Sequence, residues 1–416
     1  MRNGYIVALF SLLIIHSVSG QCPSDCSFNE NSLLGNSAGA SITTGARNSF
    51  FGAQAGQNNT SGESNSFFGR NAGMSNTTAS FNSFFGQNSG MSNTTGFDNS
   101  FFGNYSGALN TTAARNSFYG AAAGINTTTG GNNSFVGTFA GAGNTTGFEN
   151  SFFGADAGRA NINGGENAFF GNEAGRNNTE GGSNSFYGRS AGFANLSGGD
   201  NSFVGRDAGF FNLTGSSNSF VGSGAGFSNT EGHGNSYFGQ RAGNHATGSS
   251  NVMIGFGAGP TIDSGAVHQR LYIHADTSTI EGNDFPLIYG EFDNHFVRIN
   301  GAFEVTGGMF HLSSRNVKSN FRSVDKNGIL EKLNQLEISQ WEYNDRPDET
   351  HLGPVAEEFH ELFGLGLNEK SISTIDADGV MMIAIQALHE ENERLKLELE
   401  RQGKLIEGLV ERLGEE

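Results

Sequence analysis

Proline and cysteine are scarce in this chain, which has 5 Pro and 2 Cys among 416 residues. Glycine is abundant at 63 residues, but it does not recur at every third position, so the chain is not a collagen. Disorder is not indicated either, because a chain with 37 Phe and 11% aromatic residues is driven to bury them. The composition therefore predicts a regular structure that buries phenylalanine.

Positive charge is also in short supply. The chain has 23 Lys and Arg against 41 Asp and Glu, which gives a formal net charge of -18. Proteins that bind nucleic acid need a surplus of basic side chains to neutralise phosphates. The sequence therefore predicts no nucleic-acid partner.

Long hydrophobic runs are confined to the N-terminus. Residues 1–20 begin with Arg2, continue through the apolar run Ile6–Ile15 and end in small residues at Val18–Gly20. This order is typical of a signal peptide, with the mature chain starting at Gln21. An uncleaved membrane anchor is the alternative, but ten apolar residues span only about half of a bilayer core. We expect a secreted protein, extracellular or at a cell surface, with no membrane span after removal of the signal.

The two cysteines lie close together in a short N-terminal cap over residues 21–30. In an exported chain, Cys22 and Cys26 indicate a disulfide, either within one chain or between neighbouring chains. Two thiolates without a nearby histidine would fill only half of a metal coordination shell. No glycine loop that could cradle a phosphate precedes a helix. The sequence thus predicts neither a metal nor a cofactor.

A repeat of 17 residues occupies residues 31–259. Its consensus is N-S-F-F-G-x-x-A-G-x-x-N-T-T-G-x-x, and the fifth and ninth positions are glycine in all thirteen in-phase copies. A last copy follows at Asn251, one residue early. The in-phase copies start at Asn31, Asn48, Asn65, Asn82, Asn99, Asn116, Asn133, Asn150, Asn167, Asn184, Asn201, Asn218 and Asn235.

A fixed period of this size indicates units that stack on one another, because one unit cannot bury its own apolar face. Seventeen residues are too few for a helical hairpin and suit one coil of a parallel β-solenoid, or β-roll. We expect a short strand at Ser-Phe-Phe, a glycine turn, a second short strand around the alanine, and a turn at Asn-Thr-Thr-Gly. At about 4.8 Å per coil, fourteen coils make a rod on the order of 65 Å long.

The third and fourth repeat positions are both large and apolar, as in Phe50 and Phe51. Successive strand residues point to opposite faces, so one of the two rows lies outside the coil. An exposed stripe of this size predicts self-association, and a homotrimer would hide three stripes about one axis. The repeat resembles the β-roll heads of trimeric adhesins, and this resemblance implies a cell-surface or glycan ligand.

The Asn-Thr-Thr-Gly corners admit two interpretations. They form N-glycosylation sequons, at Asn76, Asn93, Asn110 and Asn144 for example. Alternatively, Asn and Thr are present for turn geometry and for side-chain ladders between coils. The second interpretation is favoured, because a repeat multiplies any sequon that it contains.

Beyond the repeats the composition changes twice. Residues 260–312 contain short alternating segments at Arg270–His274, Pro286–Gly290 and His295–Ile299, which are typical of strands in a neck. Residues 313–416 then hold 34 charged residues in 104, whereas the preceding 312 residues hold the remaining 30. A new domain is therefore predicted to begin at Ser313.

The chain ends in a predicted coiled coil over residues 381–416. Apolar side chains recur there at alternating spacings of four and three once Asn392 and Gln402 are included. The alternative is a simple amphipathic core helix, but the flanks rich in Glu, Lys and Arg favour self-association. The apolar positions are Met381, Ile385, Leu388, Leu395, Leu399, Ile406, Leu409 and Leu413.

Residues 313–380 contain ordered motifs: Ser313-Ser-Arg-Asn-Val-Lys-Ser-Asn-Phe321, Trp341-Glu-Tyr343, His351-Leu-Gly-Pro-Val-Ala-Glu-Glu-Phe359 and Ile375-Asp-Ala-Asp-Gly379. In this order they resemble the endosialidase-type intramolecular chaperone. Such domains end trimeric fibres, help the upstream β-structure to trimerise, and then release themselves by cutting the chain just before a serine.

The resemblance implies an autocatalytic serine endopeptidase that acts once, with a cut between Leu312 and Ser313. The family's serine and lysine stand five residues apart, which matches Ser313 and Lys318. The family's usual aspartate after the serine is Ser314 here. His351 either assists or orients the dyad or makes a structural hydrogen bond.

The Ser-Lys spacing constrains the local structure. A serine hydroxyl needs a base to attack an amide, and a lysine serves when it is neutral. On an α-helix, residues five apart are rotated by about 140° and do not meet. Ser313 is therefore expected at or just before a helix start, or beside a lysine from another chain, so that cutting depends on folding.

The sequence thus predicts a mainly β protein, a secreted trimeric fibre with a self-cleaving C-terminal chaperone. The alternative is an adhesive or structural fibre with an uncleaved trimerisation clamp. An enzyme acting on polysaccharide is disfavoured, because the repeats have almost no paired carboxylates.

Overall fold

In the computed structural model the chain divides into two compact units, Met1–Phe303 and Glu304–Glu416. The structure describes residues 29–260, 266–275, 286–301, 303–306, 312–344 and 346–414. The predicted signal peptide, Cys22 and Cys26 lie outside these residues. None of the described helices is long and apolar enough to cross a membrane.

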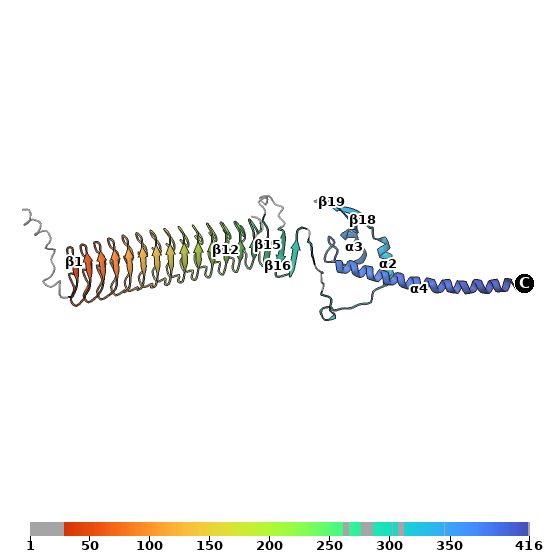
Figure 1. Ribbon diagram of the computed structural model, residues 1–416, viewed down its shortest axis with the longest axis horizontal. Coiled ribbons are helices and arrows are strands. Elements are labelled where there is room, and N and C mark those ends of the chain that lie inside the picture. The colour runs from red at the N-terminus through yellow and green to blue at the C-terminus, as the bar shows by residue number, and fades with distance from the viewer. Residues whose placement is uncertain are drawn as a thin grey trace, which may run out of the picture. The chain divides into compact units, whose positions relative to one another are not determined.

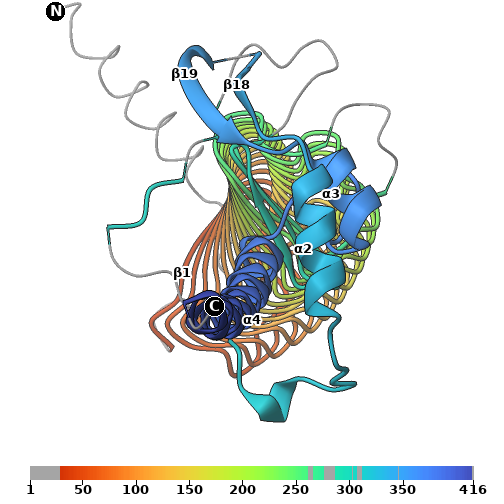
Figure 2. The same cartoon turned by 90° about the vertical axis from the view of Figure 1, so that its right-hand side faces the viewer.

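The first unit is a parallel β-solenoid, as the 17-residue period predicts. Each coil contributes one three-residue strand, and from β1 to β13 each strand pairs in register with the strand 17 residues further on, as Phe50 does with Phe67. The last step, from β13 to β14, is 16 residues. The strands form one row along the rod, and successive coils superpose with a small progressive rotation (Figures 1 and 2). The strands are β1 (Ser32–Leu34), β2 (Ser49–Phe51), β3 (Ser66–Phe68), β4 (Ser83–Phe85), β5 (Ser100–Phe102), β6 (Ser117–Tyr119), β7 (Ser134–Val136), β8 (Ser151–Phe153), β9 (Ala168–Phe170), β10 (Ser185–Tyr187), β11 (Ser202–Val204), β12 (Ser219–Val221), β13 (Ser236–Phe238) and β14 (Val252–Ile254).

The core of the solenoid is one side chain wide. The third position of each repeat points inward, and from Phe50 to Phe220 these phenylalanines are fully buried. Neighbouring rings stack with centroids 4.7–4.8 Å apart, which is the spacing of hydrogen-bonded strands. The alanine at the eighth position, such as Ala55, is buried beside them.

The predicted second strand around the alanine is not present in the described coils 29–260. Positions six to eleven form turns instead, because Gln54 and Gly56 both adopt positive φ, 61° and 55°, and interrupt the extended backbone. The coils remain hydrogen-bonded there, since the N–H of Gly56 donates to the carbonyl of Ala72 at 2.9 Å. The turns therefore stack as regularly as the strands do.

Non-glycine residues with positive φ recur at the seventh and seventeenth repeat positions. Gln54 and Ser64 are typical, and the N–H of each donates to the carbonyl of the preceding coil, at Asn36 and Ala46. No Thr, Val or Ile stands at these positions in the described coils, although threonine is frequent in the repeat. β-Branched side chains fit the left-handed region worst, so the backbone explains their exclusion.

Two buried asparagine ladders hold successive coils together. At the first position, the N–H of Asn65 donates to Oδ1 of Asn48 at 3.0 Å. At the twelfth position, Nδ2 of Asn76 donates to Oδ1 of Asn59 at 2.7 Å and to the carbonyl of Ala79 at 3.0 Å. Asn76, like the other sequon asparagines Asn93, Asn110 and Asn144, is fully buried. The folded coil therefore supports the ladder interpretation of these residues over glycosylation.

Between Asn59 and Asn229 the twelfth-position ladder has one break, at Thr127. Its hydroxyl and Oδ1 of Asn110 are buried without hydrogen-bond partners in the described structure. Replacing Thr127 with Asn is expected to supply Nδ2 to Asn110 and to stabilise the solenoid by about 1–3 kcal/mol, because an unpaired buried acceptor costs about that much. Urea unfolding followed by circular dichroism measures this. The neighbouring exposed Thr129→Asn is the control, with an expected change below about 0.5 kcal/mol.

The solenoid ends in a small meander at the predicted neck segments. β14 pairs parallel with β15 (Arg270–Ile273), which pairs antiparallel with β16 (Ile288–Glu291), and β16 pairs antiparallel with β17 (Phe296–Ile299). In the last full coil, Tyr237 replaces the inward phenylalanine, and burial raises the pKa of its phenol far above the ordinary value. The change from parallel to antiparallel pairing ends the stack of coils, because β16 runs in the opposite direction to the strands of the solenoid.

The described residues of the second unit form three α-helices and a hairpin. The helices are α2 (Lys326–Gln335), α3 (Ala356–Phe363) and α4 (Thr374–Leu413), the hairpin pairs β18 (Ser339–Tyr343) with β19 (Arg346–Gly353), and a 3₁₀ turn, η1, covers Arg315–Val317. A small core joins Leu336, Phe359 and Val380. Val380 belongs to the first turns of α4, so that helix begins inside the domain core and continues past the predicted coiled-coil start at 381.

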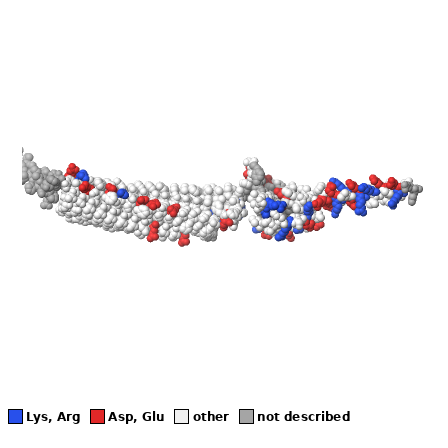
Figure 3. Space-filling model, turned by 90° about the horizontal axis from the view of Figure 1, so that it is seen from below, with Lys and Arg blue, Asp and Glu red and all other residues white. Residues whose placement is uncertain are grey.

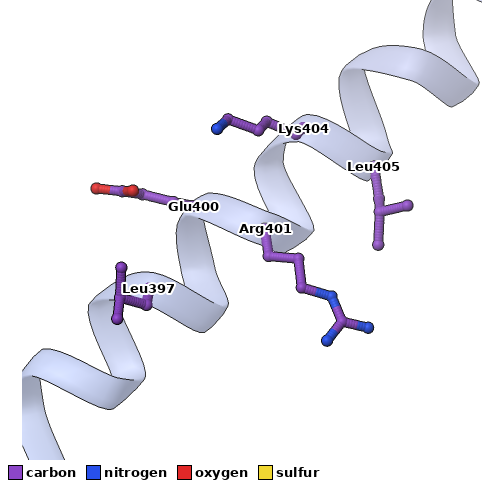
Figure 4. A pocket seen from close by; sticks show the side chains of 5 residues that line it. All are labelled: Leu397, Glu400, Arg401, Lys404 and Leu405. Carbon is purple, nitrogen blue, oxygen red and sulfur yellow. The ribbon is translucent and has the colours of Figure 1, made fainter.

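The apolar seam predicted on α4 is exposed. Its eight apolar side chains, from Met381 to Leu413, are 47–73% exposed. Charged residues, sparse over the solenoid, crowd the second unit (Figure 3). Leu397, Glu400, Arg401, Lys404 and Leu405 line a shallow hollow, and all five project from α4 alone (Figure 4). No second element of the described chain covers this part of the helix.

Candidate functional site

Ser313 and Lys318 lie on either side of the short turn η1. The side chain of Ser314 caps the turn by accepting from the N–H of Asn316 at 3.3 Å, and Lys318 follows the turn with an extended backbone. This single turn reverses the chain enough for Nζ of Lys318 to donate to Oγ of Ser313 at 2.6 Å. The structure thus brings the two residues together within one chain.

The contact has the geometry required of a nucleophile and its base. A hydroxyl within about 2.6–3.2 Å of an amine can transfer its proton directly. Both residues are exposed in the single chain, and so is Leu312, whose side chain is 80% exposed. The residues on both sides of the peptide bond between Leu312 and Ser313 are therefore exposed to solvent.

Sequence reasoning did not identify a second contact around the turn. The guanidinium of Arg315 lies over the ring of Phe321, 4.9 Å from its centroid. This cation-π contact joins η1 to the segment that follows Lys318. In the sequence, this contact is indicated only by the position of Arg315, two residues after Ser313.

His351 lies in β19, opposite Trp341 of β18. Its ring packs against the indole at 4.7 Å and against Tyr343 at 5.4 Å. Its buried Nε2 has no hydrogen-bond partner, and no hydrogen bond links it to Ser313 or Lys318 in the described part of the chain. The structure therefore places His351 in an aromatic cluster on the hairpin.

The described residues hold no cluster of three or more His, Cys, Asp or Glu able to bind a metal ion.

Comparison with known families identifies the segment around this dyad. Residues 313–364 match the Peptidase_S74 family, described as chaperone of endosialidase. The chain carries a chaperone-of-endosialidase domain. The match begins at Ser313, so the dyad opens the domain. No curated protein and no solved structure matches the chain.

The matched segment of the chaperone-of-endosialidase domain spans η1, α2, the hairpin and α3. Its hydrophobic core also needs Val380 of α4, outside the match. An ion pair between Lys326 of α2 and Glu390 of α4 fastens the helix further along. The first part of α4 is thereby packed against the domain that contains the dyad, and the seam continues beyond it.

Proposed function

We propose that the C-terminal unit assembles three chains into a fibre and then cuts itself off between Leu312 and Ser313. The main support for cleavage is the hydrogen bond of 2.6 Å from Nζ of Lys318 to Oγ of Ser313, the first residue of the domain. The exposed seam of α4 supports assembly. Each chain acts once, so the unit is a self-processing peptidase without turnover.

The proposed reaction uses only groups of this chain and one water molecule. Neutral Lys318 takes the proton of the Ser313 hydroxyl as Oγ attacks the carbonyl carbon of Leu312. The C–N bond breaks, the amine of Ser313 takes up the proton, and an ester joins Leu312 to Oγ. Water then hydrolyses the ester, leaving a carboxylate on Leu312 and the free hydroxyl on Ser313.

Assembly would provide the desolvation of the Lys318 amine that a single chain lacks. A lysine acts as a base only when its environment disfavours the ammonium form, and burial does so. Lys318 is exposed in the single chain. Packing of neighbouring chains around η1 would remove water from its amine, so that cutting follows trimerisation.

Coiled-coil pairing of α4 is the proposed means of assembly. The seam would bury Met381, Ile385 and the leucines further along, with Asn392 as a polar residue that fixes the register of the chains. Leu405 and Val410 flank the seam and are also exposed, and this widens the apolar face beyond a narrow two-stranded stripe. A bundle of three helices would use the wider face.

The fibre would lie outside the cell. The apolar N-terminal run supports export, and the mature fibre would comprise residues 21–312, with Cys22 and Cys26 as a disulfide near its start. A cell-surface or glycan ligand follows from the resemblance of the repeat to trimeric adhesin heads.

Two mass measurements, one on the wild-type chain and one on the Ser313→Ala variant, test this function. Denaturing mass spectrometry is expected to show two fragments, one ending at Leu312 and one beginning at Ser313. Native mass spectrometry of Ser313→Ala, in which the chains stay whole, is expected to show three copies. A single uncut species from the wild-type chain would contradict cleavage and support the alternative, a permanent trimerisation clamp. A monomeric mass for Ser313→Ala would contradict assembly.

A further inference from the structure

The strand face of the solenoid carries an unbroken column of apolar side chains, here called the outer row. It consists of the fourth repeat position in the fourteen strands β1–β14, and it continues over the whole rod. Most of its side chains are partly or substantially exposed, such as Tyr119 at 44% and Phe153 at 37%. Its members are Leu34, Phe51, Phe68, Phe85, Phe102, Tyr119, Val136, Phe153, Phe170, Tyr187, Val204, Val221, Phe238 and Ile254.

The rings of the outer row stack on one another along the rod. Phe51 and Phe68 have centroids 4.8 Å apart and an interplanar angle of 8°, and the stack continues through Tyr119. The faces of the rings are therefore used within the row, and their edges point outward. Sugars usually bind aromatic side chains by stacking on the ring faces, and few ring faces are accessible in this row. The outward ring edges can instead interdigitate with the ring edges of a second such row.

Charge is absent from the strand face itself. The only other outward position of each strand is the second, which is serine in twelve coils, alanine at Ala168 and valine at Val252. Exposed aromatic residues elsewhere on the rod, such as Phe97 and Phe148, do not form a column of this length. An uncharged, regular and mostly apolar face is typical of a surface that packs against a copy of itself.

The size of the outer row fits a stable interface. Nine of the fourteen side chains are 37–54% exposed and the other five are half-buried. At roughly 150–200 Å² for a large apolar side chain, the row offers on the order of 800 Å² of apolar area. A stable protein–protein interface takes about 800 Å² from each partner. The aromatic cluster around Phe211, at the tenth and eleventh repeat positions, is confined to a few coils and offers less area.

We propose that the outer row is the contact between rods: it packs against the outer rows of the other copies of this chain, parallel and in register. This rests on the proposed assembly of three chains by the C-terminal unit, since chains joined there at their C-terminal ends run in the same direction. The apolar contact lines the axis of the fibre, and the turns face outward.

The test introduces charge into the row and compares it with charge beside it. The full-length chain carrying Ser313→Ala keeps the rods attached to the C-terminal unit. Phe102→Lys with Phe153→Lys places two ammonium groups in the outer row. Phe97→Lys with Phe148→Lys is the matched control, and each of its residues lies five positions earlier in the chain, in the preceding coil. All four phenylalanines are partly or substantially exposed.

Electron microscopy of the three proteins gives the mass per length of the rod. The parent and the control are expected to show single thick rods, and the outer-row variant is expected to show splayed arms with about a threefold lower mass per length. Val136→Lys with Val204→Lys repeats the test without removing a stacked ring, in case the first variant does not fold by circular dichroism.

The outcomes separate this inference from the proposed function. A native mass of three chains with rods already splayed in the parent would overturn the outer-row contact and leave assembly intact. Thick rods in both outer-row variants, with folded coils, would overturn it as well. A monomeric parent would contradict both.

Discussion

Replacing Ser313 with alanine is expected to leave every chain uncut. The variant loses the hydroxyl to which Nζ of Lys318 donates, while the core around Leu336, Phe359 and Val380 is untouched, so folding and assembly should persist. Denaturing mass spectrometry would show a single species of full length. Fragments separated at residues 312 and 313 in this variant would mean that the nucleophile is another group.

Two further substitutions test whether Lys318 acts as a base or only as a positive charge beside Ser313. Lys318→Arg keeps the positive charge and the capacity to donate to Ser313, but a guanidinium does not give up its proton, so cutting should also be lost. Ser314→Ala removes the cap of η1, which costs about 1 kcal/mol, and should slow cutting by no more than about tenfold. Full activity of Lys318→Arg would exclude lysine as the base.

Gly226→Ala is expected to destabilise the solenoid by roughly 3–5 kcal/mol, because two costs combine. Gly226 has φ of 61°, where alanine is strained, and a Cβ would run into three ring carbons of the buried Phe220. Urea unfolding monitored by circular dichroism measures the loss.

Gly224→Ala in the same coil is the matched control for this prediction. Its φ is 67°, but the nearest atom to an added Cβ is 3.7 Å away, and Ala122 occupies the equivalent position of another coil with φ of 56°. The expected loss is therefore about 1 kcal/mol. Equal losses at the two positions would show that backbone strain dominates and that contact with the ring matters little.

The solenoid was predictable from the sequence because its period is visible there. The 17-residue step and the alternation of adjacent apolar positions predicted one row inside and one outside, and Phe50 and Phe51 lie as expected. The second strand was wrong, because glycine at the ninth position and a left-handed residue at the seventh bend the chain where extension was expected. The signal for the bend was the missing Thr, Val and Ile at the seventh position, which is visible only when all coils are aligned.

The site was predictable from the sequence in part. The five-residue spacing excluded a regular helix and left two arrangements, Ser313 at a helix start or beside a lysine of another chain. Ser313 lies just ahead of η1, and the lysine that it contacts belongs to the same chain. The spacing did not predict the single 3₁₀ turn, which brings Nζ of Lys318 to 2.6 Å from Oγ of Ser313. The position of His351 depended on the hairpin register with Trp341, which no local pattern encodes.

The direction of the hydrogen bonds between coils determines how the rod responds to a pull. These bonds run from each coil to the next, as from Gly56 to Ala72, and therefore along the length of the rod. Tension on the two ends loads them directly and should strip coils one at a time from an end. Each released coil exchanges about 4.8 Å of rise for roughly 55–60 Å of extended chain. Under load a single rod would behave as an extensible tether that yields in equal steps and dissipates energy at each one.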